Sequence, residues 1–267
     1  MVAYSDEAAR MPRTDSTAAG RLAGCYVISL RPVATHAALR RAAAAHGARL
    51  LALSPWKLVG RDDAITRATL EEALSATSVI ATSPAAVRAA NALAPLHPYA
   101  DTTWLAVGAG TALALRRAGI GQVASPARMD SEGLLALTAL QHVSGMAIGV
   151  LTAPGGRDRI VPTLQARGAQ VIRADVYARM PVAPSARTVA TLRASRVPLW
   201  LALSSGEALE RTLAALPDDV AMRLRDARVV AASERLAALA RGHGFRDVVG
   251  AADARPRSLM NAAAAAA

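Results

Sequence analysis

The sequence is poor in cysteine, in aromatic residues and in lysine. Its single cysteine, Cys25, excludes a framework of disulfide bonds within the chain. Aromatic residues make up only 3% of the chain, so few rings are available to stack on nucleic-acid bases. With 53% apolar residues the chain can still bury a core, which must be built from aliphatic side chains and alanine.

The sequence also lacks the usual patterns of a metal or nucleotide site. Its five histidines are scattered, and no group of His and Cys has the spacing of metal ligands. Neither a phosphate-binding Walker loop nor a Gly-x-Ser-x-Gly elbow is present. Gly108-Ala109-Gly110 opens like a dinucleotide fingerprint, but Leu113 stands where the third glycine should be. We therefore predict no metal and no cofactor.

No apolar run approaches the length of a membrane span. Residues 1–22 are polar and lack the apolar middle of a signal peptide. We expect a cytoplasmic protein, with no membrane partner, in which residues 1–22 and 261–267 are disordered tails. The second of these tails ends in a run of alanine that shows no periodicity.

The formal net charge is +11, and Lys57 is the only lysine among the basic residues. One interpretation is attraction of an anionic partner, and the other is a GC-rich genome that encodes Arg in place of Lys. The arginines are scattered singly rather than clustered, which argues against a nucleic-acid partner. Attraction of a small anion and codon composition both remain open.

Residues 146–182 predict one βαβ unit. An apolar run at 147–151 has the length of a buried strand, and Ala153-Pro154-Gly155-Gly156 predicts a tight turn. Apolar residues then recur at helical spacing as far as Gly168, which suits a left-handed helix cap, and a second strand follows. Backbone N–H groups between a strand and the next helix are typical anion donors.

The same pattern occurs earlier in the chain, offset by 121 residues. HGARLL at 46–51 matches RGAQVI at 167–172, and IATSP at 80–84 matches LALSS at 201–205. LAVGAGTALAL at 105–115 precedes VVAASERLAAL at 229–239 by nearly the same distance. Matches in register over most of the chain predict an internal duplication.

Alternating strands and helices predict an α/β fold with two doubly wound parallel sheets. Two extended connectors, 55–60 and 176–181, interrupt the two repeats. If each βαβ unit pairs with the remainder of the other repeat, the first domain comprises 23–54 plus 182–260, and the second is 61–175. We expect the connectors to act as linker strands, with a hinge and a cleft between the domains.

Small hydroxyl residues recur where predicted strands end. They are Ser83, Thr111, Ser204, Ser205 and Ser233. Doubly wound sheets bind ligands at the carboxyl ends of their strands, which favours contact with a ligand. Helix capping explains each residue equally well, and Ser83-Pro84 in particular predicts an N-cap followed by the first helical residue.

These motifs, in this order, resemble the uroporphyrinogen-III synthase family. The resemblance is carried by LTAPGGRDRIVPTLQARGAQVIRADVYAR, ATSPAAV, VGAGTALALRRAG, LSSGEAL and ASERLAALARGHGF, and covers about residues 25–250. It implies two flavodoxin-like domains joined by a two-stranded linker, with swapped βαβ units. The implied reaction cyclises the linear tetrapyrrole hydroxymethylbilane, with inversion of ring D and loss of water, in haem and porphyrin biosynthesis. No cofactor is implied.

The resemblance also implies site residues and partners. Tyr177 matches the tyrosine of the family's VYxR motif and is the candidate catalytic residue. The residues that match substrate-binding positions are Arg31, Ser83, Thr111, Gly155, Gly156, Ser205, Gly206 and Ser233. Arg31 lies in Leu-Arg-Pro, where the family often has Thr-Arg-Pro, so one hydroxyl is absent. The expected protein is a monomer that binds the tetrapyrrole and transiently contacts hydroxymethylbilane synthase.

A second class of function fits the same pattern. A two-domain binding or sensor protein for a small anion would need the same cleft and no chemistry. The lack of an export signal in residues 1–22 disfavours a periplasmic version. Incubation with freshly generated hydroxymethylbilane separates the two classes, because only the enzyme changes the ratio of product isomers.

Overall fold

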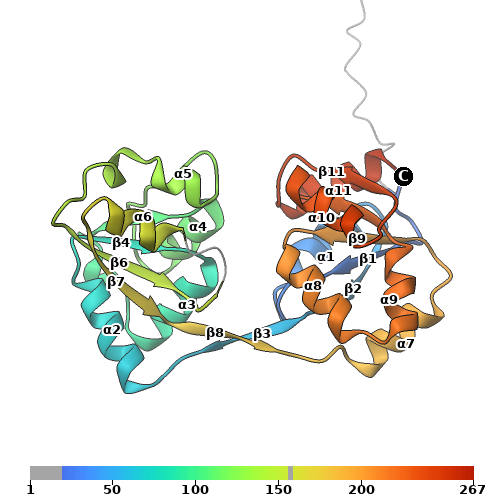
Figure 1. The fold of residues 1–267 in the computed structure, drawn as a ribbon, viewed down its shortest axis with the longest axis horizontal. Helices are drawn as coiled ribbons and strands as arrows, with labels where there is room; N and C mark the ends of the chain where they lie inside the picture. Colours follow the sequence, from blue (N-terminus) through green and yellow to red (C-terminus); the bar gives the residue numbers. More distant parts are fainter. Residues whose placement is uncertain (1–19, 156–158) are drawn as a thin grey trace, which may run out of the picture. The chain divides into compact units, whose positions relative to one another are not determined.

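The computed structural model describes residues 20–155 and 159–267, and these divide into two compact units (Figure 1). Unit 1 combines the chain up to Trp56 with Pro181–Ala267, and unit 2 is Lys57–Met180. Unit 1 is therefore assembled from both ends of the chain, whereas unit 2 is continuous. No helix in the described ranges is both long and apolar enough to cross a membrane.

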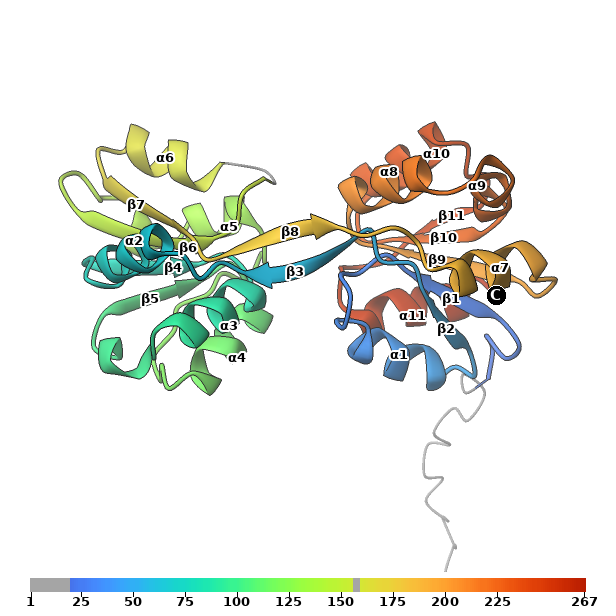
Figure 2. The same ribbon diagram turned by 90° about the horizontal axis from the view of Figure 1, so that it is seen from below.

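Unit 1 is built on five parallel strands. In spatial order they are β11 (Val248–Gly250), β10 (Arg228–Ala231), β9 (Leu199–Leu203), β1 (Tyr26–Ser29) and β2 (Arg49–Ala52). Helices α1 (Ala37–Ala44) and α11 (Pro256–Ala265) cover one face of the sheet. Helices α8 (Gly206–Ala215), α9 (Asp218–Arg225) and α10 (Glu234–Gly242) lie on the other face, and α7 (Ala186–Ala194) contacts α9 (Figure 2).

Unit 2 is built on four parallel strands. In spatial order they are β5 (Thr103–Ala106), β4 (Ser78–Ala81), β6 (Ala147–Thr152) and β7 (Gln170–Asp175). The helices are α2 (Ala64–Leu74), α3 (Pro84–Leu93), α4 (Ala109–Arg117), α5 (Ser131–Leu135) and α6 (Ile160–Ala166). Side chains of β4 alternate between the two faces, since Val79 packs with α2, α3 and α4 whereas Ile80 packs with α5 and α6.

The two units repeat one plan. The order β7–β6–β4–β5 in unit 2 corresponds to β2–β1–β9–β10 in unit 1, and an isolated parallel bridge between Leu105 and Ala124 stands at the place of β11. Corresponding elements up to α3 and α8 lie about 121 residues apart, the offset found in the sequence. The topology supports the predicted duplication.

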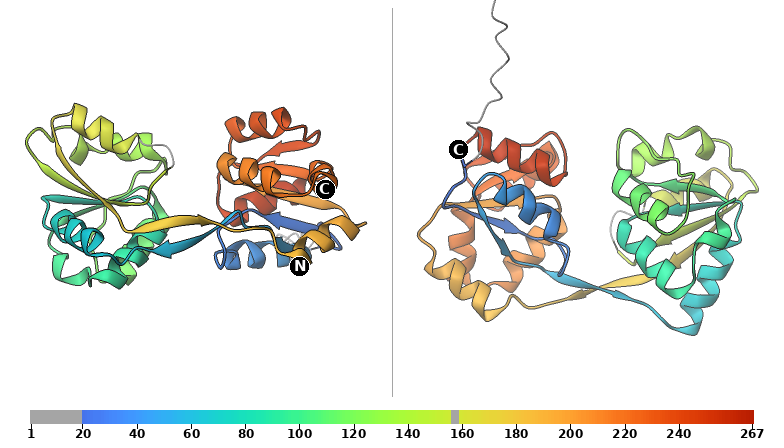
Figure 3. Two further views of the ribbon diagram at one scale, coloured as in Figure 1. Left: turned by 60° about the horizontal axis from the view of Figure 1, so that its bottom comes forward. Right: turned by 180° about the vertical axis from the view of Figure 1, so that it is seen from behind.

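Strands β3 (Trp56–Gly60) and β8 (Tyr177–Pro181) form a separate two-stranded sheet, which is visible in Figure 3. The N–H of Arg61 donates to the carbonyl of Val176, and the N–H of Val182 donates to that of Pro55. These pairs run in opposite directions along the chain, so the ladder is antiparallel. The predicted fold class, two doubly wound parallel sheets with a two-stranded linker, is confirmed.

Two predictions about the ends of the chain are wrong in part. Residues 261–267 are not a disordered tail, because α11 continues to Ala265 and buries Ala263 and Ala264. The tail assigned to residues 1–22 reaches too far, because Leu22 is fully buried and its N–H donates to the carbonyl of His46. Residues 1–19 lie outside the described part of the chain.

Residues 131–142, which we expected to form one helix, form two shorter elements. Helix α5 ends at Leu135, and a short 3₁₀ helix follows at Thr138–Leu140. The side chain of Arg167 donates to the carbonyls of Leu135 and Leu140, at 2.9 and 2.6 Å. This distant arginine satisfies carbonyl groups that a continuous helix would use internally.

Candidate functional site

A polar cavity of about 170 Å³ lies in unit 2, where β4 and β6 end. In this strand order the connections leave in opposite directions from these two neighbouring strands, which is where doubly wound sheets bind ligands. Thr82 follows β4 and Thr152 ends β6, and their Oγ1 atoms are 3.0 Å apart. Hydroxyl groups from two neighbouring strand ends therefore form the floor of the cavity.

Tyr177 and Ser83 lie together in this cavity. The Tyr177 hydroxyl is 3.2 Å from Ser83 Oγ, and the tyrosine side chain is 6% exposed. Ser83 Oγ also accepts the N–H of Ala86, so it caps α3, with Pro84 as the first helical residue. The predicted cap is confirmed. Accepting that N–H uses a lone pair of the Ser83 oxygen and not its proton, so the Ser83 hydroxyl can still donate its proton to Tyr177.

Arginine side chains supply positive charge to the same cavity. Arg173 and Arg179 both line it. The Arg173 guanidinium is held by Asp175, at 3.1 Å from Nε to Oδ1, and donates to the carbonyl of Ala153 at 3.3 Å. Both side chains of the ion pair are about one quarter exposed, and the pair fixes the direction of the Arg173 guanidinium. The cavity thus combines hydroxyl donors with guanidinium groups.

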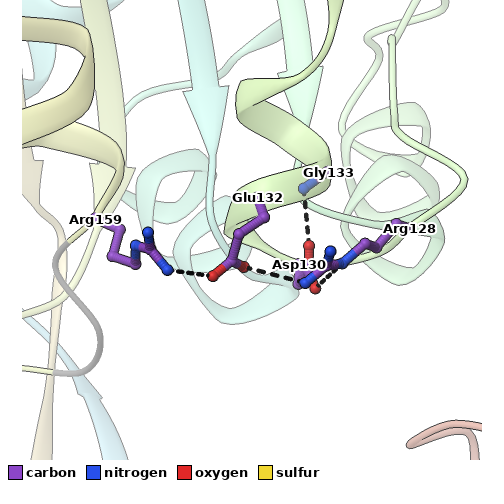
Figure 4. Close-up of polar contacts among 5 residues, drawn as sticks. All are labelled: Arg128, Asp130, Glu132, Gly133 and Arg159. Atoms are coloured by element: carbon purple, nitrogen blue, oxygen red, sulfur yellow. Dashed lines mark hydrogen bonds and ion pairs between the residues drawn. The ribbon is translucent and has the colours of Figure 1, made fainter.

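The N-terminus of α5 borders the cavity through Ser131, and its neighbours form a charged network (Figure 4). Asp130 caps the helix by accepting the N–H of Gly133 at 2.8 Å. Asp130 also pairs with Arg128 at 2.6 Å, and Glu132 pairs with Arg159 at 2.6 Å. The Glu132–Arg159 pair joins the start of α5 to the residue before α6, and so stabilises this border of the cavity.

The glycine turn and Thr111 differ in their relation to the cavity. Gly155 lines it with φ +79°, a conformation that favours glycine. Gly156 lies outside the described residues. Thr111 is 4% exposed within α4 and is not among the residues that line the cavity. The structure thus brings together Tyr177, Ser83 and Gly155, but not Thr111.

The remaining predicted site residues lie in unit 1, at the corresponding end of its sheet. Arg31 follows β1, and Ser205 caps α8 by accepting the N–H of Ala208 at 3.3 Å. Gly206 begins α8, where an added Cβ would lie 2.6 Å from Leu239 Cδ2. Ser233 precedes α10 without a side-chain cap hydrogen bond. A side chain at Gly206 would therefore require the end of the Leu239 side chain to shift.

Arg31 has an unusual electrostatic environment for an arginine. Partial burial lowers the pKa of its guanidinium, and Nη2 donates to the carbonyl of Ala254 at 3.3 Å. Within the described ranges, no carboxylate forms an ion pair with it. A half-buried cation that lacks a protein counterion favours an external anion.

The sequence did not identify several polar residues of the unit 2 cavity. They are Thr82, Thr152, Ser131, Arg173 and Arg179. Thr82 directly precedes the predicted Ser83, which was a usable signal, whereas Arg173 is brought to the cavity by the register of β7 beside β6. No group of three or more His, Cys, Asp or Glu side chains in the described chain could hold a metal ion.

Comparison with known proteins places these features in a family. A family model described as "Uroporphyrinogen-III synthase HemD" matches residues 37–261. The uroporphyrinogen-III synthases of Escherichia coli (strain K12) and Salmonella typhimurium (strain LT2) are each 34% identical to the chain over 161 residues, which is 60% of this chain. The chain spans 65% of the length of these curated relatives.

Two solved structures share the fold. A mutant uroporphyrinogen-III synthase from the extremely thermophilic bacterium Thermus thermophilus has a TM-score of 0.58 at 18% identity, covering 90% of this chain and 96% of that one. The enzyme from Helicobacter pylori 26695 has a TM-score of 0.61 at 11% identity, covering 92% and 100%. At these identities the likeness shows the fold alone.

Proposed function

Because the chain belongs to the uroporphyrinogen-III synthase family, we propose that it cyclises hydroxymethylbilane to uroporphyrinogen III, with inversion of ring D and loss of water. The observation that supports this most directly is the pairing of Tyr177 with Ser83 in a polar cavity at the ends of β4 and β6. A phenol beside a hydroxyl relay can supply the proton that departs with the leaving hydroxyl.

The reaction begins with departure of the substrate's hydroxyl group. Electron density from the adjoining pyrrole pushes out the hydroxyl, which takes a proton from Tyr177 and leaves as water, so that a protonated azafulvene (an azafulvenium cation) remains opposite the Tyr177 phenolate. Ser83 donates its proton toward the Tyr177 oxygen as the phenol loses its own. Negative charge left on that oxygen lies one hydrogen bond from the N-terminus of α3, where helix dipoles stabilise anions.

The second part of the reaction is chiefly a matter of orientation. The azafulvene must be attacked by the substituted position of ring D, which gives a spiro intermediate, and not by the free position, which gives the type I isomer. If the protein holds the carboxylate side chains of the substrate in fixed positions, only one of these two attacks is geometrically favoured. In unit 2, Arg173, Arg179 and the N–H groups near Gly155 are the proposed carboxylate donors.

Unit 1 contains a second group of proposed donors. Arg31, Ser205, Gly206 and Ser233 lie at strand ends or helix N-termini, where backbone N–H groups are available to carboxylates. Thr111 is buried in α4, and we propose that it supports the turn before that helix. The substrate carries eight carboxylates, so several separate anion contacts suit it.

The test is incubation with hydroxymethylbilane generated immediately before use, followed by separation of the product isomers. Hydroxymethylbilane closes without enzyme to the type I isomer. We expect mainly the type III isomer when the protein is present. Equal isomer ratios with and without the protein would refute the proposed function.

A further inference from the structure

A buried histidine that the proposed chemistry does not use lies in unit 1, at the end of the loop after β1. His36 is 6% exposed, and both of its ring nitrogens have side-chain partners. Nδ1 is 2.9 Å from the hydroxyl of Ser29, and Nε2 is 2.8 Å from the hydroxyl of Ser54. Ser29 ends β1 and Ser54 follows β2, so one imidazole joins two neighbouring strand ends.

The loop between Arg31 and His36 is held at several further points. The N–H of Val33 donates to the carbonyl of Trp56 at 3.0 Å, and Thr35 Oγ1 donates to that of Pro32 at 2.7 Å. Ala34 has φ +64°, which is the one left-handed conformation of a non-glycine residue in the described chain. Such a conformation is unfavourable and persists where surrounding contacts determine it.

These contacts bear on Arg31, which begins the loop. We propose that His36 is a positioning residue, which holds loop 31–36 between Ser29 and Ser54 so that Arg31 is presented to a substrate carboxylate. The inference rests on the proposed function, in which Arg31 binds the substrate. Burial lowers the pKa of His36, and the positive charges of Arg40 and Arg31 lower it further. The imidazole is therefore neutral near pH 7, with one nitrogen donating and the other accepting.

The test is a double-mutant cycle on kcat/KM for hydroxymethylbilane. Arg31→Ala removes a charge-assisted contact, and we expect kcat/KM to fall by about 10- to 100-fold, mainly through KM. His36→Ala should produce a similar fall by releasing the loop. The double variant should be little worse than either single variant, because both remove the same contact. If the fold-losses in kcat/KM of the two single variants instead multiply in the double variant, the proposal is overturned.

Partial replacement separates positioning from mere stability. His36→Asn keeps a polar group near Nδ1, and His36→Gln keeps one near Nε2, so each should restore part of the loss in kcat/KM. His46→Gln is the matched control, because that histidine in the same unit contacts Asn261 and lies away from the loop. We expect its KM to equal that of the wild type. Losses in the His36 series that follow the melting temperature alone would also overturn the proposal.

Amide hydrogen exchange gives a readout that does not depend on activity. In His36→Ala the N–H of Val33 should exchange faster by about tenfold or more, whereas the N–H groups of β1 should stay protected. Unchanged exchange at Val33 would show that His36 does not hold the loop. If the wild type fails to form the type III isomer, the proposed function fails, and exchange at Val33 still decides whether His36 holds the loop.

Discussion

Replacing Tyr177 with phenylalanine removes one hydroxyl and leaves the ring in place. The loss of stability is small, because Ser83 Oγ keeps the N–H of Ala86 as a partner. Only the 3.2 Å contact between Ser83 Oγ and the Tyr177 hydroxyl disappears. One such hydrogen bond contributes about 1 kcal/mol to the free energy of unfolding. The loss for the reaction is larger, because the leaving hydroxyl no longer receives a proton. General acid catalysis contributes about 10²- to 10⁴-fold, so turnover should fall by about 10²-fold or more.

The assay measures the rate of type III isomer formation at saturating hydroxymethylbilane, together with thermal unfolding. Ser83→Ala should also lower turnover, but it removes an N-cap at the same time and should destabilise the fold by about 1 kcal/mol. Ser185→Ala is the control for that cap, since Ser185 accepts the N–H of Thr188 at 3.1 Å on an exposed helix start. Turnover close to wild type in Tyr177→Phe would remove Tyr177 from the mechanism and leave the family assignment intact.

Further predictions concern pH, packing and composition. Because the pKa of folded His36 is lowered, the unfolded chain binds its proton first, near pH 6.5. The free energy of unfolding should therefore decrease as pH falls from about 6.5 toward the lower folded pKa. In His36→Gln the urea midpoint should decrease less than in the wild type over the same pH range, because the titrating ring is absent. Gly149→Ala places a Cβ 2.1 Å from the carbonyl oxygen of Ala73, so β6 and α2 must separate, and denaturation should show a loss of about 1–3 kcal/mol or more. Dialysis against a chelator should leave activity unchanged, because the scattered histidines lack ligand spacing; a metal requirement would contradict the site assignment. Sedimentation should show a monomer, and a dimer that persists on dilution would refute that expectation.

The order of elements could be predicted from the sequence because periodicity, turn residues and caps agree with one another. The end of the chain could not, since a run of alanines is equally apolar on every face. Packing against α1, more than two hundred residues earlier, and against β9, β10 and β11 determines that Ala263 and Ala264 are buried.

In the candidate site, too, some residues could be recognised from local motifs, whereas others are placed by strand pairing. Tyr177 and Ser83 carry motifs that can be read locally, and the structure places them 3.2 Å apart. Arg173 and Thr152 carry no such motif. They reach the cavity through the register of β7 on β6, where Arg173 pairs with Val150 and Asp175 with Thr152. Two-residue alternation along a strand then determines which side chains face the ligand.

The discontinuous assembly of unit 1 has a consequence for folding during synthesis. Strand β1 lies in the interior of its five-stranded sheet, yet its neighbour β9 begins at Leu199. While the ribosome makes the intervening chain, β1 has only β2 beside it and one of its edges is unpaired. Unit 2 is complete once Met180 has been made, so it can fold first. The exposed edge of β1 is then an aggregation hazard that lasts until the last third of the chain emerges, and chaperone binding during translation should concentrate on residues 26–52.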